Sequence, residues 1–305
     1  MRASLWNWEY LFQTNNNADC IPEEDRFKFV DDLSTLEVIN LIAVGLSSLF
    51  MKGHIPSDIP DHGQFIQSNN LKSQEYLHKI NEWTESHKMV ISEKKTKAMI
   101  FNFTENYQFT TRLDLKGKNV EIVDQMKILG TVINTRLSWD ENCSEIIKKV
   151  NARMQLLREL QSFGATHDEM VHFWILFCRS VLEQSCVVWG TSLTQENIDN
   201  LERTQKTFTK LVLREKFKSY ENALLLLNMD NLETRRKDMI LRFAKNGIKN
   251  QTLNDLFPIN EKIHKMNKRT NEKYEVNFAN TDRLKNASII TMQKLLNEDN
   301  VKNAT

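Results

Sequence analysis

The sequence predicts an α+β protein, with a small sheet in the first half of the chain and helices in the second half. Among its 305 residues only 8 are glycine and 4 are proline, a composition that favours long helices over loop-rich or all-β folds. Polar and apolar residues alternate in short runs before residue 135, which is typical of strands. From residue 138 onward apolar residues recur at helical spacing, which predicts a succession of helices.

The first predicted strand is the alternating run from Arg26 to Val30, which leads directly into Asp31 and Asp32. The residues Ser-Thr-Leu-Glu at 34–37 have the pattern of a capping box and predict a helix that ends near residue 50. Turn residues, amphipathic runs and β-rich runs define the other elements of this half. They are a loop over 53–70, a helix over 71–87, a strand over 97–103, a hairpin over 113–123 and a strand with an internal glycine over 127–133.

The second half of the chain is predicted to be helical. The expected helices cover 141–162, 167–189, 194–216, 220–228 and 231–250. We place a seam near residue 136 and expect four parts. These are an irregular lead-in over 1–25, a small mixed or antiparallel sheet with helices over 26–135, a helical region over 136–250 and a loosely structured basic tail over 251–305. The net charge is only +1, but residues 231–305 carry 15 basic and 9 acidic side chains.

Cysteine usage and hydropathy favour an intracellular protein. None of the 4 cysteines has a partner at C-x-x-C spacing, which favours reduced thiols. The longest apolar stretch, 38–51, is too short to span a bilayer, and the first residues lack the apolar core of a signal peptide. We therefore expect a nuclear or cytoplasmic protein without a membrane partner. Residues in apolar runs are expected in the core: Trp83, Trp139, Trp174, Trp189, Cys178 and Cys186.

The candidate catalytic motif is Phe29-Val30-Asp31-Asp32 at the end of the first predicted strand. Two neighbouring carboxylates supply the hard oxygen ligands that Mg²⁺ prefers, and polymerases use two such ions in nucleotidyl transfer. Adjacent acidic residues are, however, most often solvated turn residues. The tetrapeptide alone therefore leaves a metal site and a solvated turn as open alternatives.

Further motifs follow this tetrapeptide in a fixed order. They are Trp83, the segment 89–101 with Lys95-Thr96-Lys97, the segment 127–133 with Leu129-Gly130, Leu137-Ser138-Trp139, and helical segments at 148–153, 179–183, 188–190 and 201–206. With these motifs in this order, from about residue 27 to 214, the sequence resembles the C-terminal part of the reverse transcriptase of non-LTR retrotransposons. The resemblance implies a partial palm followed by a thumb-like helical region.

The resemblance also implies roles for individual residues. Asp31 and Asp32 match the palm hairpin whose acidic residues are catalytic and bind Mg²⁺. Lys95 and Lys97 match a strand that lies near the incoming nucleotide, and Gly130 matches the primer-grip strands. An RNA template and a DNA primer are the implied partners, and RNA-directed DNA polymerase is the implied activity.

The predicted helix over 141–162 has a candidate nucleic-acid face. Its apolar residues leave Lys149 and Arg153, with Lys148 and Arg158, on the other side, where they could contact phosphates. A second set of basic residues comes further along the chain. It comprises Lys206, Lys210 and Arg214 at four-residue spacing, and the run Arg235-Arg236-Lys237. The alternative for both sets is an ordinary solvated helix face.

The sequence also departs from the family. The family's fingers and its other metal-binding strand precede the Asp-Asp hairpin, whereas only 30 residues precede Asp31 here, and Ser34 to Glu37 predicts a helix where a second hairpin strand is usual. We therefore expect a truncated polymerase that is inactive as this chain and holds Mg²⁺ weakly. The alternative is a non-catalytic remnant that binds nucleic acid or another protein. An incomplete sheet would expose an edge for self-association or for a partner chain.

Overall fold

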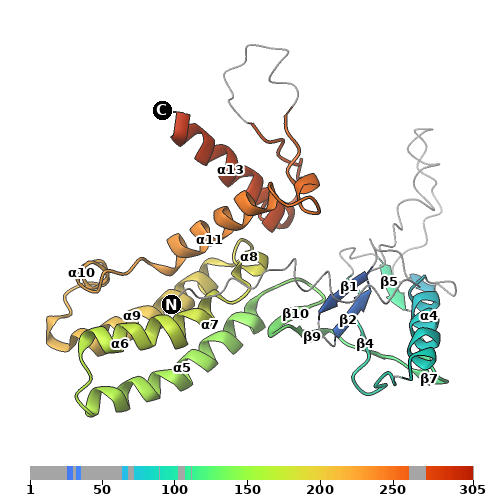
Figure 1. Cartoon of the computed structure of the whole chain (residues 1–305), viewed down its shortest axis with the longest axis horizontal. Helices are drawn as coiled ribbons and strands as arrows, with labels where there is room; N and C mark the ends of the chain where they lie inside the picture. The colour runs from blue at the N-terminus through green and yellow to red at the C-terminus, as the bar shows by residue number, and fades with distance from the viewer. Residues whose placement is uncertain are drawn as a thin grey trace. The chain divides into compact units, whose positions relative to one another are not determined.

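The computed structural model describes residues 26–29, 32–35, 64–67, 72–88, 90–101, 107–110, 112–260 and 273–304. The chain contains both helices and short strands, which confirms the α+β class (Figure 1). It divides into two compact units, residues 1–125 and 126–305, so the predicted seam near residue 136 lies inside the second unit.

The first unit begins with an antiparallel hairpin. Strand β1 (Arg26–Phe29) pairs with β2 (Asp32–Thr35), and Phe29 lies opposite Asp32. The predicted helix start at 34–37 is therefore wrong at its first two residues, because they pair in register with Arg26 and Phe27. In the hairpin, the backbone N–H and C=O groups of these residues form hydrogen bonds with the neighbouring strand instead of the bonds that they would form within a helix. The rest of that predicted helix, like the lead-in over 1–25, lies outside the described residues.

Three more two-stranded pairs belong to this unit. Parallel pairs join β3 (Gln64–Gln67) to β5 (Tyr107–Thr110) and β4 (Lys97–Ala98) to β8 (Glu121–Ile122), while β6 (Asp114–Leu115) and β7 (Lys118–Asn119) form an antiparallel hairpin. The predicted hairpin is confirmed, with positive φ angles at Lys116 (55°) and Gly117 (79°) that suit a tight turn. The strand predicted over 97–103 is shorter than expected, and the loop predicted over 53–70 contains β3.

Helix α4 (Lys72–Ser86) matches the helix predicted over 71–87 and packs on the β6–β7 hairpin (Figure 1). The Gln74 side chain donates to the Asp114 carbonyl over 2.9 Å and accepts from the Asp114 amide over 2.8 Å. At the other end of α4 the Trp83 ring stacks on His87, with ring centroids 4.3 Å apart. Trp83 is half-buried, so it is less enclosed than a core anchor.

The second unit opens with β9 (Gln125–Ile128) and β10 (Thr131–Asn134), which pair with each other. The two residues between them, Leu129 and Gly130, have positive φ angles of 48° and 87°. Two such residues in succession form the tight hairpin turn that matches strand twist. The single strand predicted over 127–133 is therefore wrong, because the chain reverses at its glycine. An internal glycine predicts either a bulge or a close approach. Here it permits a close approach, since a Cβ atom at Gly130 would lie 2.7 Å from the Gln184 amide nitrogen.

The helices of the second unit follow the predicted order. They are α5 (Asp140–Ser162), α6 (His167–Phe173), the π-helical segment η2 (Trp174–Arg179), α7 (Ser180–Glu183), α8 (Cys186–Trp189), α9 (Gln195–Leu213), the 3-10 turn η3 (Arg214–Lys216), α10 (Tyr220–Leu226) and α11 (Leu232–Gly247). Side-chain oxygens of Thr166, Thr194, Ser219 and Asn231 accept a backbone hydrogen bond at the starts of four of them. The helix predicted over 167–189 is interrupted at Gln184 and Ser185, because Ser185 is left-handed with a φ of 53°.

A continuous apolar core holds these helices together. Trp139, Trp174 and Trp189 are buried in it, which confirms three of the four predicted tryptophan anchors. The Trp174 indole stacks on Phe208 of α9 with centroids 4.4 Å apart. Cys178 and Cys186 are fully buried, as predicted.

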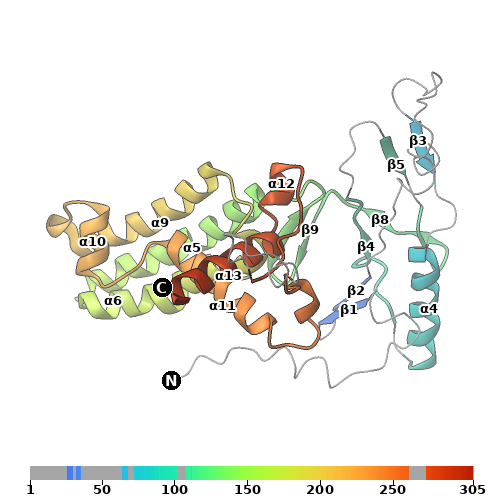
Figure 2. The ribbon, with the colours of Figure 1, turned by 90° about the horizontal axis from the view of Figure 1, so that it is seen from above.

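The described part of the predicted loose tail is ordered and packed. It contains η4 (Asn254–Leu256), α12 (Asp282–Lys285) and α13 (Ser288–Ala304), and α13 lies beside α11 (Figure 2). Four apolar residues of the tail form a second core with Ile240 and Ala244 of α11: Phe257, Tyr274, Met292 and Leu296. The buried amide of Asn297 exchanges two hydrogen bonds of 2.9 Å with the backbone of Tyr274. The expectation of a loose tail is therefore wrong for 273–304. The many charged residues of this segment suggested loose packing, but its apolar residues lie together on one face and are buried.

Candidate functional site

The candidate metal residues lie at the β1–β2 hairpin. Asp32 is the first residue of β2 and pairs with Phe29, and the two intervening residues include Asp31, which lies outside the described residues. In the part of the chain that the structure describes, no group of three or more His, Cys, Asp or Glu side chains could hold a metal ion. Because Asp31 was not among those residues, the Mg²⁺ site stays a prediction.

The motif Lys95-Thr96-Lys97 begins in a turn that precedes β4. The Ser92 carbonyl accepts hydrogen bonds of 3.0 Å from the amides of Lys95 and Thr96, and one of 2.9 Å from the Thr96 hydroxyl. This turn leaves Lys95 exposed. Lys97, the first residue of β4, has its ammonium 3.3 Å from the Glu121 carboxylate on the neighbouring strand. The two lysines therefore differ: Lys95 faces solvent, and the charge of Lys97 already has a partner.

Gly130 has a structural role in the second unit. The Gln184 amide nitrogen donates to the Leu129 carbonyl over 3.2 Å, and a Cβ atom at Gly130 would lie only 2.7 Å from that nitrogen. The Gln184 carbonyl in turn accepts from the Trp189 indole over 2.9 Å. Gly130 thus lets the β9–β10 turn contact the break between α7 and α8, and its primer-grip role stays a prediction.

Helix α5 has the amphipathic arrangement predicted for it. Ile146, Val150, Met154 and Leu157 are buried against the neighbouring helices. Lys148 and Arg158 are exposed, whereas Lys149 and Arg153 are half-buried. The Arg153 guanidinium donates to the Phe177 carbonyl on η2, so this side chain joins two helices. The part of α5 that faces solvent is consequently less basic than the sequence suggests, and the nucleic-acid roles of Lys149 and Arg153 stay predictions.

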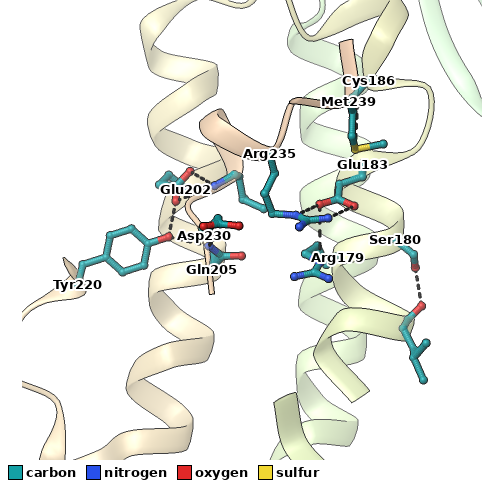
Figure 3. A network of polar contacts seen from close by, with 12 residues as sticks. Arg179, Ser180, Glu183, Cys186, Glu202, Gln205, Tyr220, Asp230, Arg235 and Met239 are labelled. Atoms are coloured by element: carbon teal, nitrogen blue, oxygen red, sulfur yellow. Dashed lines mark hydrogen bonds and ion pairs between the residues drawn. The ribbon is translucent and has the colours of Figure 1, made fainter. Parts of the chain in front are cut away.

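The run Arg235-Arg236-Lys237 on α11 is turned largely into the fold. Arg235 pairs with Glu183 of α7 (Figure 3), and Lys237 pairs with Glu233 at 2.7 Å. Arg236 is only 3% exposed. Burial lowers its pKa because it disfavours the charged guanidinium. Arg235 therefore ties α11 to α7, Arg236 is enclosed in the fold, and Lys237 pairs within α11 while it remains exposed to solvent.

Sequence reasoning missed a partly buried polar network between α9, α10 and α11. The Tyr220 hydroxyl donates to the Glu202 carboxylate, and the Gln205 amide donates to the Tyr220 oxygen over 3.0 Å (Figure 3). Gln205 also donates to the Asp230 carbonyl over 2.9 Å, and Glu202 accepts from the Leu232 amide. The available signal was Gln205 among the residues of the apolar face of α9.

A basic, exposed region lies along the C-terminal half of α9 and the turn that follows it. We name it the α9 basic surface, and its members are Arg203, Lys206, Lys210, Arg214, Lys216 and Lys218. All six side chains are exposed. The Lys210 ammonium lies 5.4 Å from the centroid of the half-buried Phe217 ring. Three of these residues are the Lys206, Lys210 and Arg214 set that the sequence singles out, and the structure places the set next to three more cations.

Comparison of the chain with protein-family models, curated proteins and solved structures gave no match. Over the described residues, no helix has the length and hydropathy needed to cross a bilayer.

Proposed function

We propose that this chain carries the second half of a reverse-transcriptase palm and the thumb-like helices of a non-LTR retrotransposon enzyme, an RNA-directed DNA polymerase. The observation that carries the proposal is the β1–β2 hairpin. Strand β1 pairs antiparallel with β2, with Phe29 opposite Asp32. The resemblance called for a second strand after the acidic pair, and β2 occupies those positions.

The hairpin supports the proposal through the chemistry that it allows. Nucleotidyl transfer by two metal ions requires carboxylates on a rigid support, because each ion must hold its oxygen ligands at fixed distances. A paired strand provides such a support for Asp32. Carboxylate oxygens also suit Mg²⁺, which this pair would hold while it activates the primer hydroxyl.

Asp31 and Asp32 do not by themselves complete such a site. Two neighbouring residues supply few ligands, and two-metal sites draw carboxylates from more than one strand. We therefore propose that these 305 residues alone do not extend a primer. The palm proposal thus predicts activity only where a further carboxylate, from outside the acidic pair, completes the site.

The α9 basic surface favours the second candidate, a non-catalytic nucleic-acid-binding protein. Exposed cations can bind phosphates without any metal site. The other non-catalytic function expected from the sequence is protein binding, in which an exposed sheet edge pairs with a second copy of this chain or with a partner chain. The two candidates make different predictions about Asp31, because only polymerase chemistry depends on it.

Reconstitution tests the polymerase proposal. The purified chain should extend no primer on an RNA template with Mg²⁺. Extension should begin when a second polypeptide adds the fingers and the first half of a non-LTR palm, and Asp31→Ala should abolish it. Asp124→Ala, which changes an exposed acidic residue of the same unit, is the matched control and should leave extension intact.

Two results would contradict the proposal in different ways. Primer extension by the chain alone, lost in Asp31→Ala, would show that the chain is not inactive. A reconstituted mixture in which the chain is folded, as shown by its circular dichroism, but extends nothing would count against the palm assignment.

A further inference from the structure

We propose that two copies of this chain associate through an exposed apolar surface formed by α5 and η2. We name it the α5–η2 patch, and its members are Leu156, Leu160, Phe163, Phe173, Leu176 and Phe177. Phe173 is half-buried, and the other five side chains are exposed. The inference goes beyond the proposed functions, because it involves neither Asp31 nor phosphate binding nor the pairing of strands at a sheet edge.

Helix α5 is apolar on two adjacent faces. The first face packs in the core through buried residues: Ile146, Val150, Met154 and Leu157. The second face consists of Leu156, Leu160 and Phe163, which follow one another at spacings of four and three residues. Apolar residues at these spacings form the contact line of packed helix pairs. The second face is exposed, so it offers a contact line for a further helix.

The π-helical segment η2 supplies the other part of the patch. The ring centroids of Phe173, the last residue of α6, and Phe177 lie 4.8 Å apart. Leu176 lies between them in the sequence and is exposed, as is Phe177. A π-helical turn is rare, and many such turns occur at functional sites. Here the wide turn presents large apolar side chains to solvent.

The two parts of the patch lie side by side. Only the four residues 163–166 connect α5 to α6, so α6 runs back along α5 (Figure 1). The Arg153 guanidinium donates to the Phe177 carbonyl, which sets the register of the two segments. One turn closer to the connection, Leu156 therefore lies level with Phe173. The leucines of α5 and the two rings thus form one continuous surface.

The patch is large enough to form the centre of a dimer interface. Phe163 and Phe177 are 87% and 51% exposed. Together they present roughly 200–350 Å², because an aromatic side chain has about 150–250 Å² of surface. With its three leucines, the patch matches the largest apolar patch of a typical monomer, about 300–600 Å², which is often functional. A stable interface buries about 800 Å² per partner around an apolar centre, and the polar residues beside the patch supply the remainder.

The charges around the patch favour a second copy as its occupant. Lys148 and Lys149 precede it on α5, and Glu145 lies one turn further out. The opposite end carries three exposed acidic residues: Glu159, Asp168 and Glu169. Arg158 is two residues from each leucine and therefore lies on another side of α5. A two-fold axis through the patch places the basic end of one copy against the acidic end of the other, twice in the same interface.

Sedimentation equilibrium of the full chain tests the inference. The chain should dimerise, and Leu156→Gln/Phe177→Gln should raise the dissociation constant about 100-fold, because each copy loses two apolar groups at the centre of the interface. The matched control is Leu225→Gln/Leu226→Gln, which changes two exposed leucines of α10. The control should dimerise as the parent chain does. Circular dichroism verifies that both variants keep the helical content of the parent.

A charge-reversal variant tests the two-fold arrangement. Lys148→Glu should raise the dissociation constant about 5-fold at low salt, because two like charges then meet at each end of the interface. In about 0.5 M salt this difference should largely disappear, since the ions screen exposed charges. Lys148→Glu/Glu159→Lys should restore dimerisation, because the two ends are then complementary again.

Three results would overturn the inference. The first is a chain that stays monomeric up to roughly 100 μM, whether or not its patch binds another protein or a lipid vesicle. The second is a dimer that Leu156→Gln/Phe177→Gln leaves unchanged, which would place self-association elsewhere, as at a sheet edge. The third is equal weakening by the α10 control. None of these measurements involves Asp31 or primer extension, so they leave the palm proposal to its own test.

Discussion

The Glu183 carboxylate accepts two hydrogen bonds from the Arg235 guanidinium, 52 residues further along the chain. Both side chains are largely buried, with 14% and 25% of their surfaces exposed, and Arg179 lies 3.7 Å from the same carboxylate (Figure 3). The paired hydrogen bonds tie α11 to α7, which lies next to the break in the helical region. A planar guanidinium matches a carboxylate in this way, and a lysine ammonium does not.

Removing this pair should destabilise the second unit. Arg235→Ala leaves the Glu183 carboxylate with only Arg179 nearby, and we expect a loss of about 2–3 kcal/mol in the free energy of unfolding. Urea denaturation followed by circular dichroism measures it. Lys237→Ala breaks an exposed ion pair on the same helix and should cost less than about 0.5 kcal/mol. Equal losses in the two variants would mean that the Glu183–Arg235 pair does not stabilise the fold.

The hydroxyl of Tyr220 should make stability depend on alkaline pH. Burial, and the hydrogen bond to Glu202, raise the pKa of Tyr220 well above its usual value of 10.0. The unfolded chain releases this proton first, so the stabilising effect is complete below about pH 10 and declines as pH rises above it. Phenolate absorbance during alkaline titration should therefore show one tyrosine that ionises only as the second unit unfolds.

The matched variant for this prediction is Tyr220→Phe. It should lose the delayed phenolate and cost about 1–2 kcal/mol at neutral pH, because Glu202 and Gln205 each lose a partner. If all tyrosines of the parent chain titrate together near pH 10, the buried hydroxyl is not protected as described.

Gly130 should tolerate a side chain less well than Gly164. Both have left-handed φ angles, 87° and 85°, but a Cβ atom meets the Gln184 amide only at Gly130. Gly164→Ala should therefore cost about 1 kcal/mol from backbone strain alone, and Gly130→Ala should cost more. In a Gln184→Ala background the cost at Gly130 should fall to that at Gly164. An unchanged cost in that background would rule out the steric conflict.

The buried thiols should resist modification in the native protein. Burial raises the pKa of Cys143 to about 12, and the pKa values of Cys178 and Cys186 to about 11. A thiol-disulfide reagent at mildly alkaline pH should thus label at most one of the 4 cysteines rapidly. All of them should react after unfolding in guanidinium. Rapid labelling of two or more would contradict the core placement.

The sequence predicts the helices of the second unit better than the strands of the first. Apolar periodicity and capping residues, such as Thr166 and Thr194, fix where α6 and α9 begin, because both signals are local. The strands are paired over two to four residues, and their partners can be distant, as for Lys97 and Glu121. The capping-box pattern at 34–37 therefore predicted a helix start that does not form. Ser34 and Thr35 pair with a neighbouring strand, and this pairing outweighs the local preference for a helix cap.

The candidate site shows a similar division. The exposed cations of α9 were predictable from their four-residue spacing. The inward roles of Arg153, Arg235 and Arg236 were not, because a basic side chain on a helix can face either solvent or a neighbour, and only packing decides which. Gly130 was singled out by the resemblance, but its contact with Gln184 depends on a helix break that periodicity does not reveal.

The π-helical segment Trp174–Arg179 holds an additional residue per turn compared with the α-helices before and after it. A one-residue deletion there would let the segment wind as a regular α-helix. Because the wider turn absorbs one extra residue, α6 and α7 would keep nearly their present rotation about the helix axis. Met170, which is fully buried, would then still face the interior. The wide turn therefore accommodates one residue of additional chain length while the helices on either side keep their apolar faces toward the core.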